Sequence, residues 1–386
     1  MVLRDDDLFY YVFETWLFKS VLFTSELGGK LYKLGVLIDT IVILLLIYII
    51  IIKQRYDGLS FVKLLLISAI SILTYWTSGK NQLLILCCFL LASKEYDFEK
   101  VLKAAYKYIL TGLLIVFILF KMGVVKDYVL YRNGIANRHS LGFVHPNHLG
   151  LWLFSLSACY VYSRDDEQFK YFPLIFLFFF CYFVPNSQTG FVCIALLLFM
   201  MCVYSYLERN DFEKGKTNLG VILIILSLVF NIASVVLCVI DTSKIGFFNL
   251  LDIYTGKRLS MAHRSYLQYG VKIFGQSIYI SGGSGEVVFG QTRLWLDNAY
   301  MAILMRFGVI AYVGFTILYT FTMIRTMRKQ QFMTLFILFV FAVYGIMESQ
   351  FYSVAYNPFL LFISWGLFSD SDAGEYYELV YYESFK

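Results

Sequence analysis

Charged residues and proline are scarce in this chain of 386 residues. Lysine, arginine, aspartate and glutamate make up 15% of it and proline occurs 4 times, whereas 59% of the residues are hydrophobic. This composition excludes an ordinary soluble domain, because about a quarter of the residues in such domains are charged. The 7 cysteines all lie in apolar segments, which argues against a disulfide framework or a cysteine metal site.

The chain instead contains a series of long apolar runs. A helix of about 20 residues crosses roughly 30 Å of hydrocarbon, so these runs predict an all-α, polytopic integral membrane protein with about twelve transmembrane helices. The predicted spans are 8–24, 36–52, 61–77, 82–93, 105–122, 147–163, 171–185, 190–207, 219–240, 299–323, 331–347 and 355–369. The first contains Glu14 and Lys19 and alternatively lies in the interface, which leaves about eleven spans. Acidic residues at 5–7 precede the first span, where a signal peptide has basic residues, so we expect no cleavable signal peptide. We expect a single transmembrane domain over 1–386.

Basic residues gather in alternate loops. The joints at 53–63, 94–107, 164–170, 208–218 and 325–329 carry 15 lysines and arginines, and the short loops between them carry 3. The positive-inside rule therefore places these joints in the cytoplasm and the connections 123–146 and 241–298 outside. The two outward loops and their borders nevertheless hold ten basic residues: Lys121, Lys126, Arg132, Arg138, Lys244, Lys257, Arg258, Arg264, Lys272 and Arg293. Long loops translocate regardless of charge; the alternative interpretation is an outward-facing site for an anion.

The first outward loop ends in RNGIANRHSLGFVHPNHLG, residues 132–150. Pro146 suits the first turn of a helix, so Asn147 falls at a helix N-terminus, where free N–H groups attract anions. A guanidinium grips phosphate oxygens in two places. Arg138, with Arg132 six residues earlier, therefore predicts a phosphate-binding corner.

Zinc ligation by His139, His145 and His148 is a competing interpretation of the same loop. Their spacings of six and three do not place all three on one helical face, and no aspartate or glutamate occurs between 128 and 164. We therefore predict no metal here. A third interpretation is that these polar groups merely cap helices and anchor to lipid head groups.

The second outward loop, 241–298, is predicted to be partly helical. An amphipathic helix is expected over about 252–274, and its apolar stripe would contain Leu259, Ala262, Tyr266 and Leu267. Arg258 and Arg264 flank this stripe. The later GGSGE segment is glycine-rich like a phosphate-binding P-loop, but it lacks the lysine and the strand–helix context of that motif. We therefore reject the interpretation of this segment as a P-loop.

The second loop ends in LWLDNAY at the border of the tenth span. Asp297 there is a candidate general base if it is partly desolvated. An ordinary helix N-cap at this border is an equally good interpretation.

Three segments resemble a known family. Residues 138–147, RHSLGFVHPN, resemble the R-x-SLGF-x-HPN stretch of Wzy-type polysaccharide polymerases in the O-antigen ligase/polymerase family. In the second loop, TGKRLSMA and YGVKIFGQ resemble the family's GR and FGQ segments. The stretch from Asp297 to Tyr300, with Gly308 beyond it, resembles the family's [H/D]N-x-Y…G border. The similarity is confined to about 132–150, 254–276 and 297–311.

The resemblance implies a GT-C-like membrane glycosyltransferase of the bacterial cytoplasmic membrane. Such enzymes use no cofactor and join undecaprenyl-diphosphate-linked oligosaccharide repeat units, donor to acceptor, on the outer face, making capsular or exopolysaccharide. Ligases of the family generally carry histidine where this chain has Asp297, so the residue favours a polymerase. Where the family has Gly-Arg, this chain has Gly256–Lys257–Arg258, with a lysine inserted between the two residues. Either Arg258 or Arg264 could therefore correspond to the family's functional arginine.

A mechanistic hypothesis follows from the residues and the resemblance together. Arg138 and Arg258 bind the donor diphosphate without a metal, and Asp297 or His145 takes the proton of the acceptor hydroxyl. Further candidate substrate contacts are Arg132, Asn147, Lys257, Arg264, Asn298 and Tyr300.

A flippase or transporter of the same lipid-linked sugar is the main alternative, and an O-antigen-type ligase is another. A transporter is expected to carry charges along a path inside its spans. Here the spans are nearly free of charged residues, and the main exceptions are Asp39, Arg306 and Glu348 near their ends. Expected partners are the lipid-linked donor and acceptor, membrane lipid and other capsule-assembly proteins. The basic residues are spread over loops, so no nucleic acid is expected.

Overall fold

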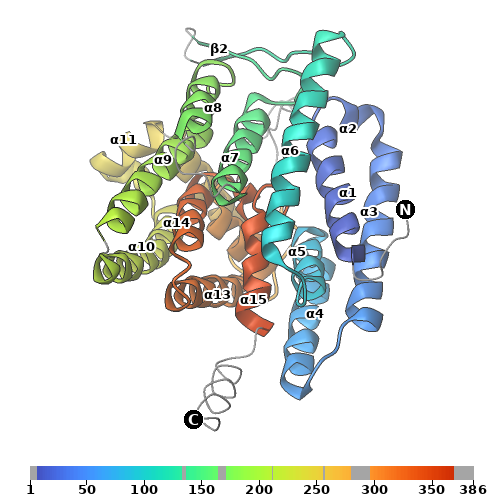
Figure 1. Ribbon diagram of the computed structural model, residues 1–386. Coiled ribbons are helices and arrows are strands. Elements are labelled where there is room, and N and C mark those ends of the chain that lie inside the picture. The colour runs from blue at the N-terminus through green and yellow to red at the C-terminus, as the bar shows by residue number, and fades with distance from the viewer. Residues whose placement is uncertain are drawn as a thin grey trace.

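The computed structural model describes residues 7–132, 136–163, 171–210, 212–254, 257–279 and 296–368. These residues are almost all helical, and the sheet among them is one short antiparallel hairpin (Figure 1). The α-helices are α1 (Leu8–Phe23), α2 (Leu27–Lys30), α3 (Tyr32–Tyr48), α4 (Gly58–Ser78), α5 (Gln82–Ala92), α6 (Phe98–Lys121), α7 (Pro146–Ser163), α8 (Tyr171–Phe183), α9 (Gln188–Arg209), α10 (Glu213–Val239), α11 (Gly246–Tyr254), α12 (Arg258–Tyr269), α13 (Ala299–Arg328), α14 (Phe332–Met347) and α15 (Phe362–Phe368). The remaining elements are a π-helical turn (Ile49–Lys53), three 3-10 turns (Thr242–Lys244, Ser349–Tyr352, Pro358–Leu361) and strands β1 (Leu130–Arg132) and β2 (Ala136–Arg138).

The all-α, membrane-type architecture expected from the sequence is confirmed. Eleven of the twelve predicted apolar runs coincide with an α-helix, because a sustained run of apolar residues is a local signal. The run 355–369 instead contains turns, the 3-10 turn Pro358–Leu361 and the short helix α15. Within the described residues, six helical segments are long and apolar enough to cross a membrane by length and composition: Tyr32–Lys53, Gly58–Ser78, Phe98–Lys121, Gln188–Arg209, Glu213–Val239 and Ala299–Arg328. The number of twelve spans and a GT-C-like arrangement remain predictions.

Helices α7 and α14 occupy the centre of the molecule. In Figure 1, α1 to α6 lie on one side of them and α8 to α10 on the other, and α7 packs against both α6 and α9. The rings of Phe154 on α7 and Phe341 on α14 lie 4.8 Å apart between centroids and are tilted by 51° to each other. Both helices are apolar and buried around most of their circumference, as expected of helices enclosed by others.

The outer helices expose large apolar side chains. Leu44 on α3, Leu66 on α4 and Phe176 on α8 are each about 60% exposed. A water-soluble monomer rarely shows so much contiguous apolar surface. These faces are suited to contact with lipid.

Helix α13 is broken at Gly308, whose φ of 92° and ψ of 175° are not helical. The segment 272–276 of the preceding loop fills the break: Gln276 N–H donates to Arg306 O at 2.9 Å, and Val309 N–H donates to Lys272 O at 3.1 Å. A Cβ on Gly308 would lie 2.3 Å from the backbone nitrogen of Gly275. Glycine is therefore required where the two backbones meet.

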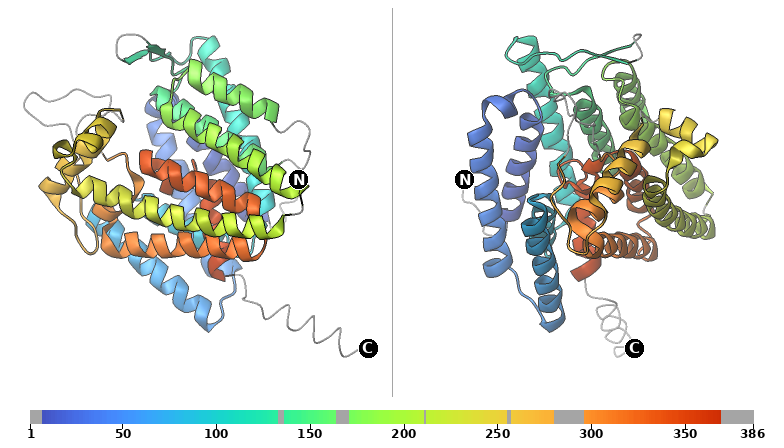
Figure 2. Two further views of the ribbon diagram at one scale, coloured as in Figure 1. Left: turned by 90° about the vertical axis from the view of Figure 1, so that its left-hand side faces the viewer. Right: turned by 180° about the vertical axis from the view of Figure 1, so that it is seen from behind.

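The helix expected over 252–274 is two helices, α11 and α12. Lys257 lies between them with a left-handed φ of 64°. The Asp252 carboxylate accepts from the backbone N–H groups of Leu259 at 2.8 Å and Ser260 at 3.1 Å, which caps the start of α12. The loop therefore turns before α12 begins, and both helices lie at the edge of the bundle (Figure 2).

The expected apolar stripe of α12 holds in part. Ala262 is buried, and Leu259 and Tyr266 pack against the core, but Leu267 is 69% exposed. One further residue turns about 100° around a helix, so Leu267 leaves the buried face. The prediction for Leu267 is wrong for this reason.

Candidate active site

The first part of the site is formed around Arg138, at the end of β2. Its side chain is buried; Nε donates to Pro185 O at 3.1 Å and the guanidinium also donates to Asn147 Oδ1. Asn147 is the second residue of α7, and its backbone N–H donates to His145 Nδ1 at 3.0 Å. Arg138, His145 and Asn147 therefore converge at the N-terminus of α7, where the sequence placed them. We call these three residues the Arg138 corner.

Asp127 anchors the loop that presents Arg138. Its carboxylate accepts from His139 Nδ1 at 2.6 Å and from the backbone N–H groups of Ser140 and Leu141 at 2.8 and 2.9 Å. Burial raises the pKa of Asp127, but these hydrogen bonds outweigh it and lower the pKa overall. Asp127 is therefore an ionised anchor whose bonds fix the residues directly after Arg138.

The three histidines of the loop have three different partners. His139 contacts Asp127, His145 accepts from Asn147, and His148 Nδ1 lies 2.8 Å from the hydroxyl of Tyr356. Within the described ranges, no three His, Cys, Asp or Glu side chains are grouped as metal ligands are. Each histidine thus serves a separate local contact.

The second part of the site is formed around Arg258, the first residue of α12. Its Nε lies 2.9 Å from Asp297 Oδ2, and one terminal nitrogen lies 3.3 Å from Glu348 Oε1. The other terminal nitrogen donates to Met347 O. Thr189, near the start of α9, donates to Glu348 Oε1 at 2.9 Å. We call Arg258, Asp297, Glu348 and Thr189 the Arg258 cluster; four separate elements supply it.

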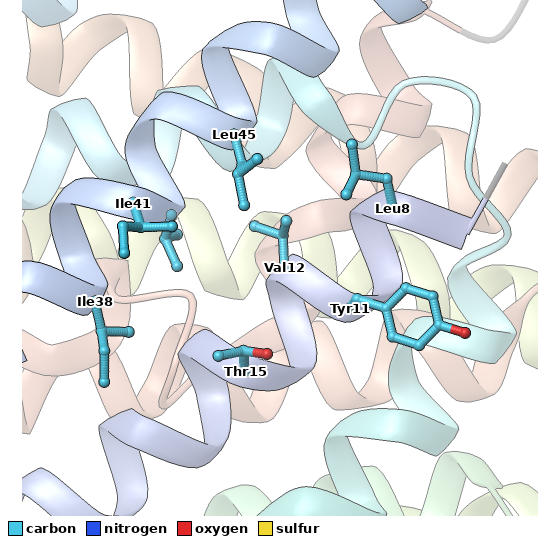
Figure 3. A pocket seen from close by; sticks show the side chains of 8 residues that line it. Leu8, Tyr11, Val12, Thr15, Ile38, Ile41 and Leu45 are labelled. Atoms are coloured by element: carbon cyan, nitrogen blue, oxygen red, sulfur yellow. The ribbon is translucent and has the colours of Figure 1, made fainter. Parts of the chain in front are cut away.

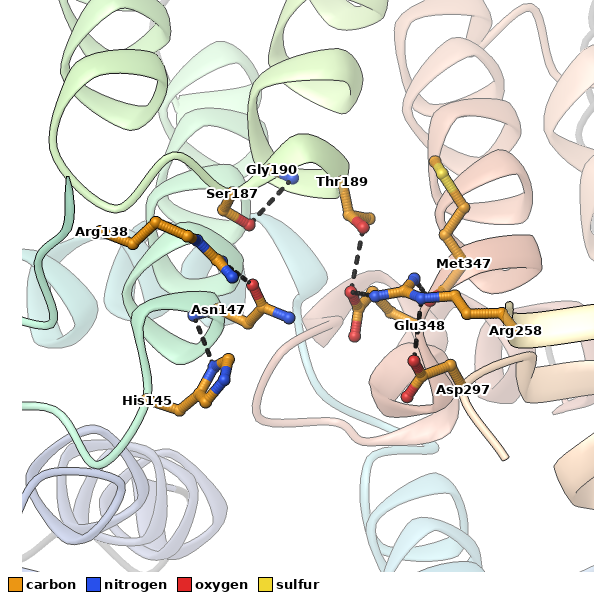
Figure 4. A network of polar contacts seen from close by, with 10 residues as sticks. All are labelled: Arg138, His145, Asn147, Ser187, Thr189, Gly190, Arg258, Asp297, Met347 and Glu348. Carbon is orange, nitrogen blue, oxygen red and sulfur yellow. Dashed lines mark hydrogen bonds and ion pairs between the residues drawn. The ribbon is translucent and has the colours of Figure 1, made fainter. Parts of the chain in front are cut away.

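The two parts face each other across the turn between α8 and α9. Pro185 O in this turn accepts from Arg138, and Thr189 just beyond it donates to Glu348. Figure 4 shows the two guanidinium groups pointing toward each other from opposite sides, with Asn147 and Glu348 between them. The arrangement gathers cationic and carboxylate groups in one place.

Asn298 takes the capping role that the sequence left open for this border. Its Oδ1 accepts from Met301 N–H at 2.9 Å and so caps α13. The neighbouring Asp297 is therefore available to pair with Arg258.

Four other predicted residues lie elsewhere or have other contacts. Arg264 is exposed on α12 and Lys257 is exposed before it. Tyr300 is buried and donates to Ala342 O at 2.7 Å, which joins α13 to α14. Arg132 lies in β1, and its side chain is outside the described residues. Of the alternative cations Arg258 and Arg264, only Arg258 lies among the clustered groups.

Glu348 and Thr189 were not predicted as site residues. The sequence did contain a signal for Glu348, because a carboxylate at the end of an apolar helix needs a cation or a hydrogen-bond donor. Its partners could not be identified, since Arg258 and Thr189 lie far away in the chain.

A cavity of about 220 Å³ lies between α1 and α3, away from these residues (Figure 3). It is lined by apolar side chains such as Leu8, Val12, Ile38 and Leu45. It contains none of the predicted site residues.

The fold and the site define an all-α protein of membrane type with a cluster of charges at its helix ends. Comparison with protein-family models, curated proteins and solved structures gives no match. Function must therefore be inferred from the residues of the site and from the motif resemblance.

Proposed function

We propose that the chain is a membrane glycosyltransferase that polymerises undecaprenyl-diphosphate-linked oligosaccharide repeat units on the outer face of the bacterial cytoplasmic membrane. The observation that carries this proposal is that Arg138 and Arg258, from separate loops, point toward one another beside the N-termini of α7 and α9 (Figure 4). The product is a capsular or exopolysaccharide. The enzyme is of the GT-C-like type.

The two arginines suit a diphosphate leaving group. When the acceptor hydroxyl attacks the anomeric carbon, the bond from that carbon to the diphosphate oxygen breaks and negative charge grows on the diphosphate. A guanidinium about 4 Å away stabilises a unit charge by roughly 4 kcal/mol at an effective dielectric near 20. Planar donors of this kind also orient the diphosphate in two directions.

The contacts of His145 and Asp297 suggest different roles for them. His145 Nδ1 accepts the N–H of Asn147, so neutral His145 carries its proton on Nε2. Asp297 is held by Arg258 at 2.9 Å. In this proposal Asp297 takes the proton of the acceptor hydroxyl, and His145 orients a substrate oxygen.

Replacement of Arg138 tests the proposal. A strain that carries Arg138→Ala should make no long polymer on a gel and should accumulate single lipid-linked repeat units on the outer face. Arg264→Ala is the matched control, because Arg264 is exposed on α12, and it should retain long polymer. Undiminished chain length in the Arg138 variant contradicts the proposal.

A transporter of lipid-linked oligosaccharide is the second candidate. It is favoured by one ion pair between predicted spans, Lys19 Nζ to Asp39 Oδ2 at 2.7 Å, which joins α1 and α3. Loss of a transporter leaves repeat units on the inner face, whereas loss of a polymerase leaves them on the outer face. A ligase differs again, because it transfers finished chains to another acceptor and its loss leaves long lipid-linked polymer.

A further inference from the structure

Glu348 has two donors on a single oxygen. Oε1 accepts from Thr189 Oγ1 at 2.9 Å and lies 3.3 Å from a terminal nitrogen of Arg258. The Glu348 side chain is 8% exposed, and that of Arg258 is 23% exposed. Arg258 can therefore be reached from solvent, while Glu348 lies behind it.

The two carboxylates that hold Arg258 are not equivalent. Asp297 lies at 2.9 Å, opposite Nε, whereas Glu348 makes the longer contact of 3.3 Å to a terminal nitrogen. Glu348 also has Thr189 as a donor, so it keeps one hydrogen bond if Arg258 moves away. The Glu348 contact is therefore the one that an incoming anion can most easily replace.

We propose that Glu348 is a displaceable counter-ion of Arg258, and that binding of an anionic diphosphate to Arg258 drives uptake of one proton by Glu348. This inference rests on the proposed function for the identity of the anion. Asp297 remains on Nε, the diphosphate oxygen takes the terminal nitrogen, and Glu348 turns to Thr189 alone. Glu348 acts through Arg258 and is a positioning residue.

The proton balance follows from burial. A buried carboxylate that loses its cation cannot stay ionised without a large desolvation cost, so it takes a proton from water. Burial already raises the pKa of Glu348, and the positive charge of Arg258 opposes part of that rise. Removal of that opposing charge raises the pKa further, and one proton per bound anion is the upper limit of uptake.

Other titratable groups face Glu348 and must be distinguished from it. Those that interact with it are Arg258 of α12, Asp297 before α13, Cys193 of α9, Tyr344 of α14 and Tyr356. His148 of α7 lies one contact further, at the hydroxyl of Tyr356. His148 is the imidazole on this chain of contacts, so its replacement is the control for assigning the proton.

Calorimetry on the purified full chain in detergent tests the proposal. The probe is a short-chain prenyl diphosphate that bears one hexose, a diester whose phosphates stay ionised across the neutral range. Binding is measured at one pH in two buffers of different ionisation enthalpy, and the difference gives the protons taken up. We expect net uptake by the wild-type chain, and an affinity that weakens with rising pH by at most about tenfold per unit, as exchange of one proton requires.

Two variants assign the proton. Glu348→Gln should bind with no uptake, show no pH dependence and bind about three- to tenfold more tightly than wild type above neutral pH, because the competing charge is gone. His148→Gln should retain the wild-type uptake. If Glu348→Gln fails to fold, the wild-type measurement decides alone: binding without proton uptake overturns the inference and leaves the proposed function standing. Uptake that persists in Glu348→Gln also overturns it, and absence of probe binding contradicts both proposals.

Discussion

The Arg138 corner and the Arg258 cluster lie on opposite sides of one site but are built from different groups. Arg138 donates to two neutral oxygens, Pro185 O and Asn147 Oδ1, whereas Arg258 contacts the carboxylates of Asp297 and Glu348. A carbonyl oxygen orients a guanidinium but does not neutralise its charge, whereas a carboxylate orients the guanidinium and also neutralises its charge. Carbonyl oxygens thus orient Arg138, whereas two carboxylates lie against Arg258.

The two sides also differ in what supports them. The Arg138 corner depends on one loop, anchored by Asp127, and on the first turn of α7. The Arg258 cluster depends on the placement of α9, α12, α13 and α14, and so on the packing of the helices. Changes to the loop should therefore affect mainly the Arg138 side, and changes to α12, α13 or α14 mainly the Arg258 side, whereas the turn before α9 contacts both.

Removal of each arginine should show the largest difference. Arg258→Ala leaves the buried Glu348 and the partly exposed Asp297 without their shared cation, and breaking a buried pair costs about 3–5 kcal/mol. Arg138→Ala leaves carbonyl oxygens that lose a donor, at about 1–2 kcal/mol. Thermal unfolding in detergent measures both, and Arg258→Ala combined with Glu348→Gln should recover part of the loss. Equal losses from the two single variants are inconsistent with the comparison.

The break in α13 should be the next most sensitive point. Gly308→Ala forces a side chain onto a φ of 92° and brings Cβ to 2.3 Å from the Gly275 nitrogen. Such backbone strain costs about 1–3 kcal/mol. The residue lies on the helix that begins beside Asp297, so the Arg258 side should be disturbed as well.

Gly314→Ala is the matched control for this helix. A Cβ on Gly314 would meet nothing within 4 Å, and alanine favours a helix over glycine by about 1 kcal/mol. The melting temperature should fall in the Gly308 variant and hold or rise in the Gly314 variant. A Gly308 variant as stable as wild type shows that segment 272–276 does not depend on the break.

The sequence predicted the parts of the molecule that local pattern determines. Apolar runs gave the positions of the main helices, and Pro146 with Asn147 gave the start of α7. The β1–β2 hairpin was not predicted, because strands of three residues are too short to show a clear alternating pattern.

Features that depend on distant residues could not be predicted. The break at Gly308 is stabilised by backbone groups of segment 272–276, more than thirty residues earlier. The division of the predicted helix into α11 and α12 is accompanied by such a contact, since Asp252 of α11 caps the start of α12 seven residues later. Glu348 was visible as an unusual charge, but its pairing with Arg258 arises from helix packing. In each case tertiary contacts decided the outcome.

The smallest expected effect concerns Asp127 and the pH dependence of the Arg138 side. The pKa of Asp127 is lowered in the folded chain, so the stability that it contributes is present above its unfolded pKa and is lost as pH falls through the folded value. Asp127→Asn should therefore cost about 1–2 kcal/mol at neutral pH, because charge-assisted hydrogen bonds weaken. The cost should begin to decline near pH 4, the ordinary pKa range of an aspartate, and vanish below the lowered pKa of the folded chain.

Hydrogen exchange of the amides at 140 and 141 measures this effect directly, since both donate to Asp127. Exchange in Asp127→Asn should be faster than in wild type at neutral pH and should converge with it in acid. The control is Asp241→Asn, because Asp241 pairs at 3.3 Å with a Lys244 side chain that is 81% exposed, and exposed pairs contribute little. If exchange is faster in Asp127→Asn while proton uptake on diphosphate binding is unchanged, the loop that presents Arg138 acts independently of the helices that hold Arg258. Loss of that uptake in Asp127→Asn would instead show that the two sides act as one unit.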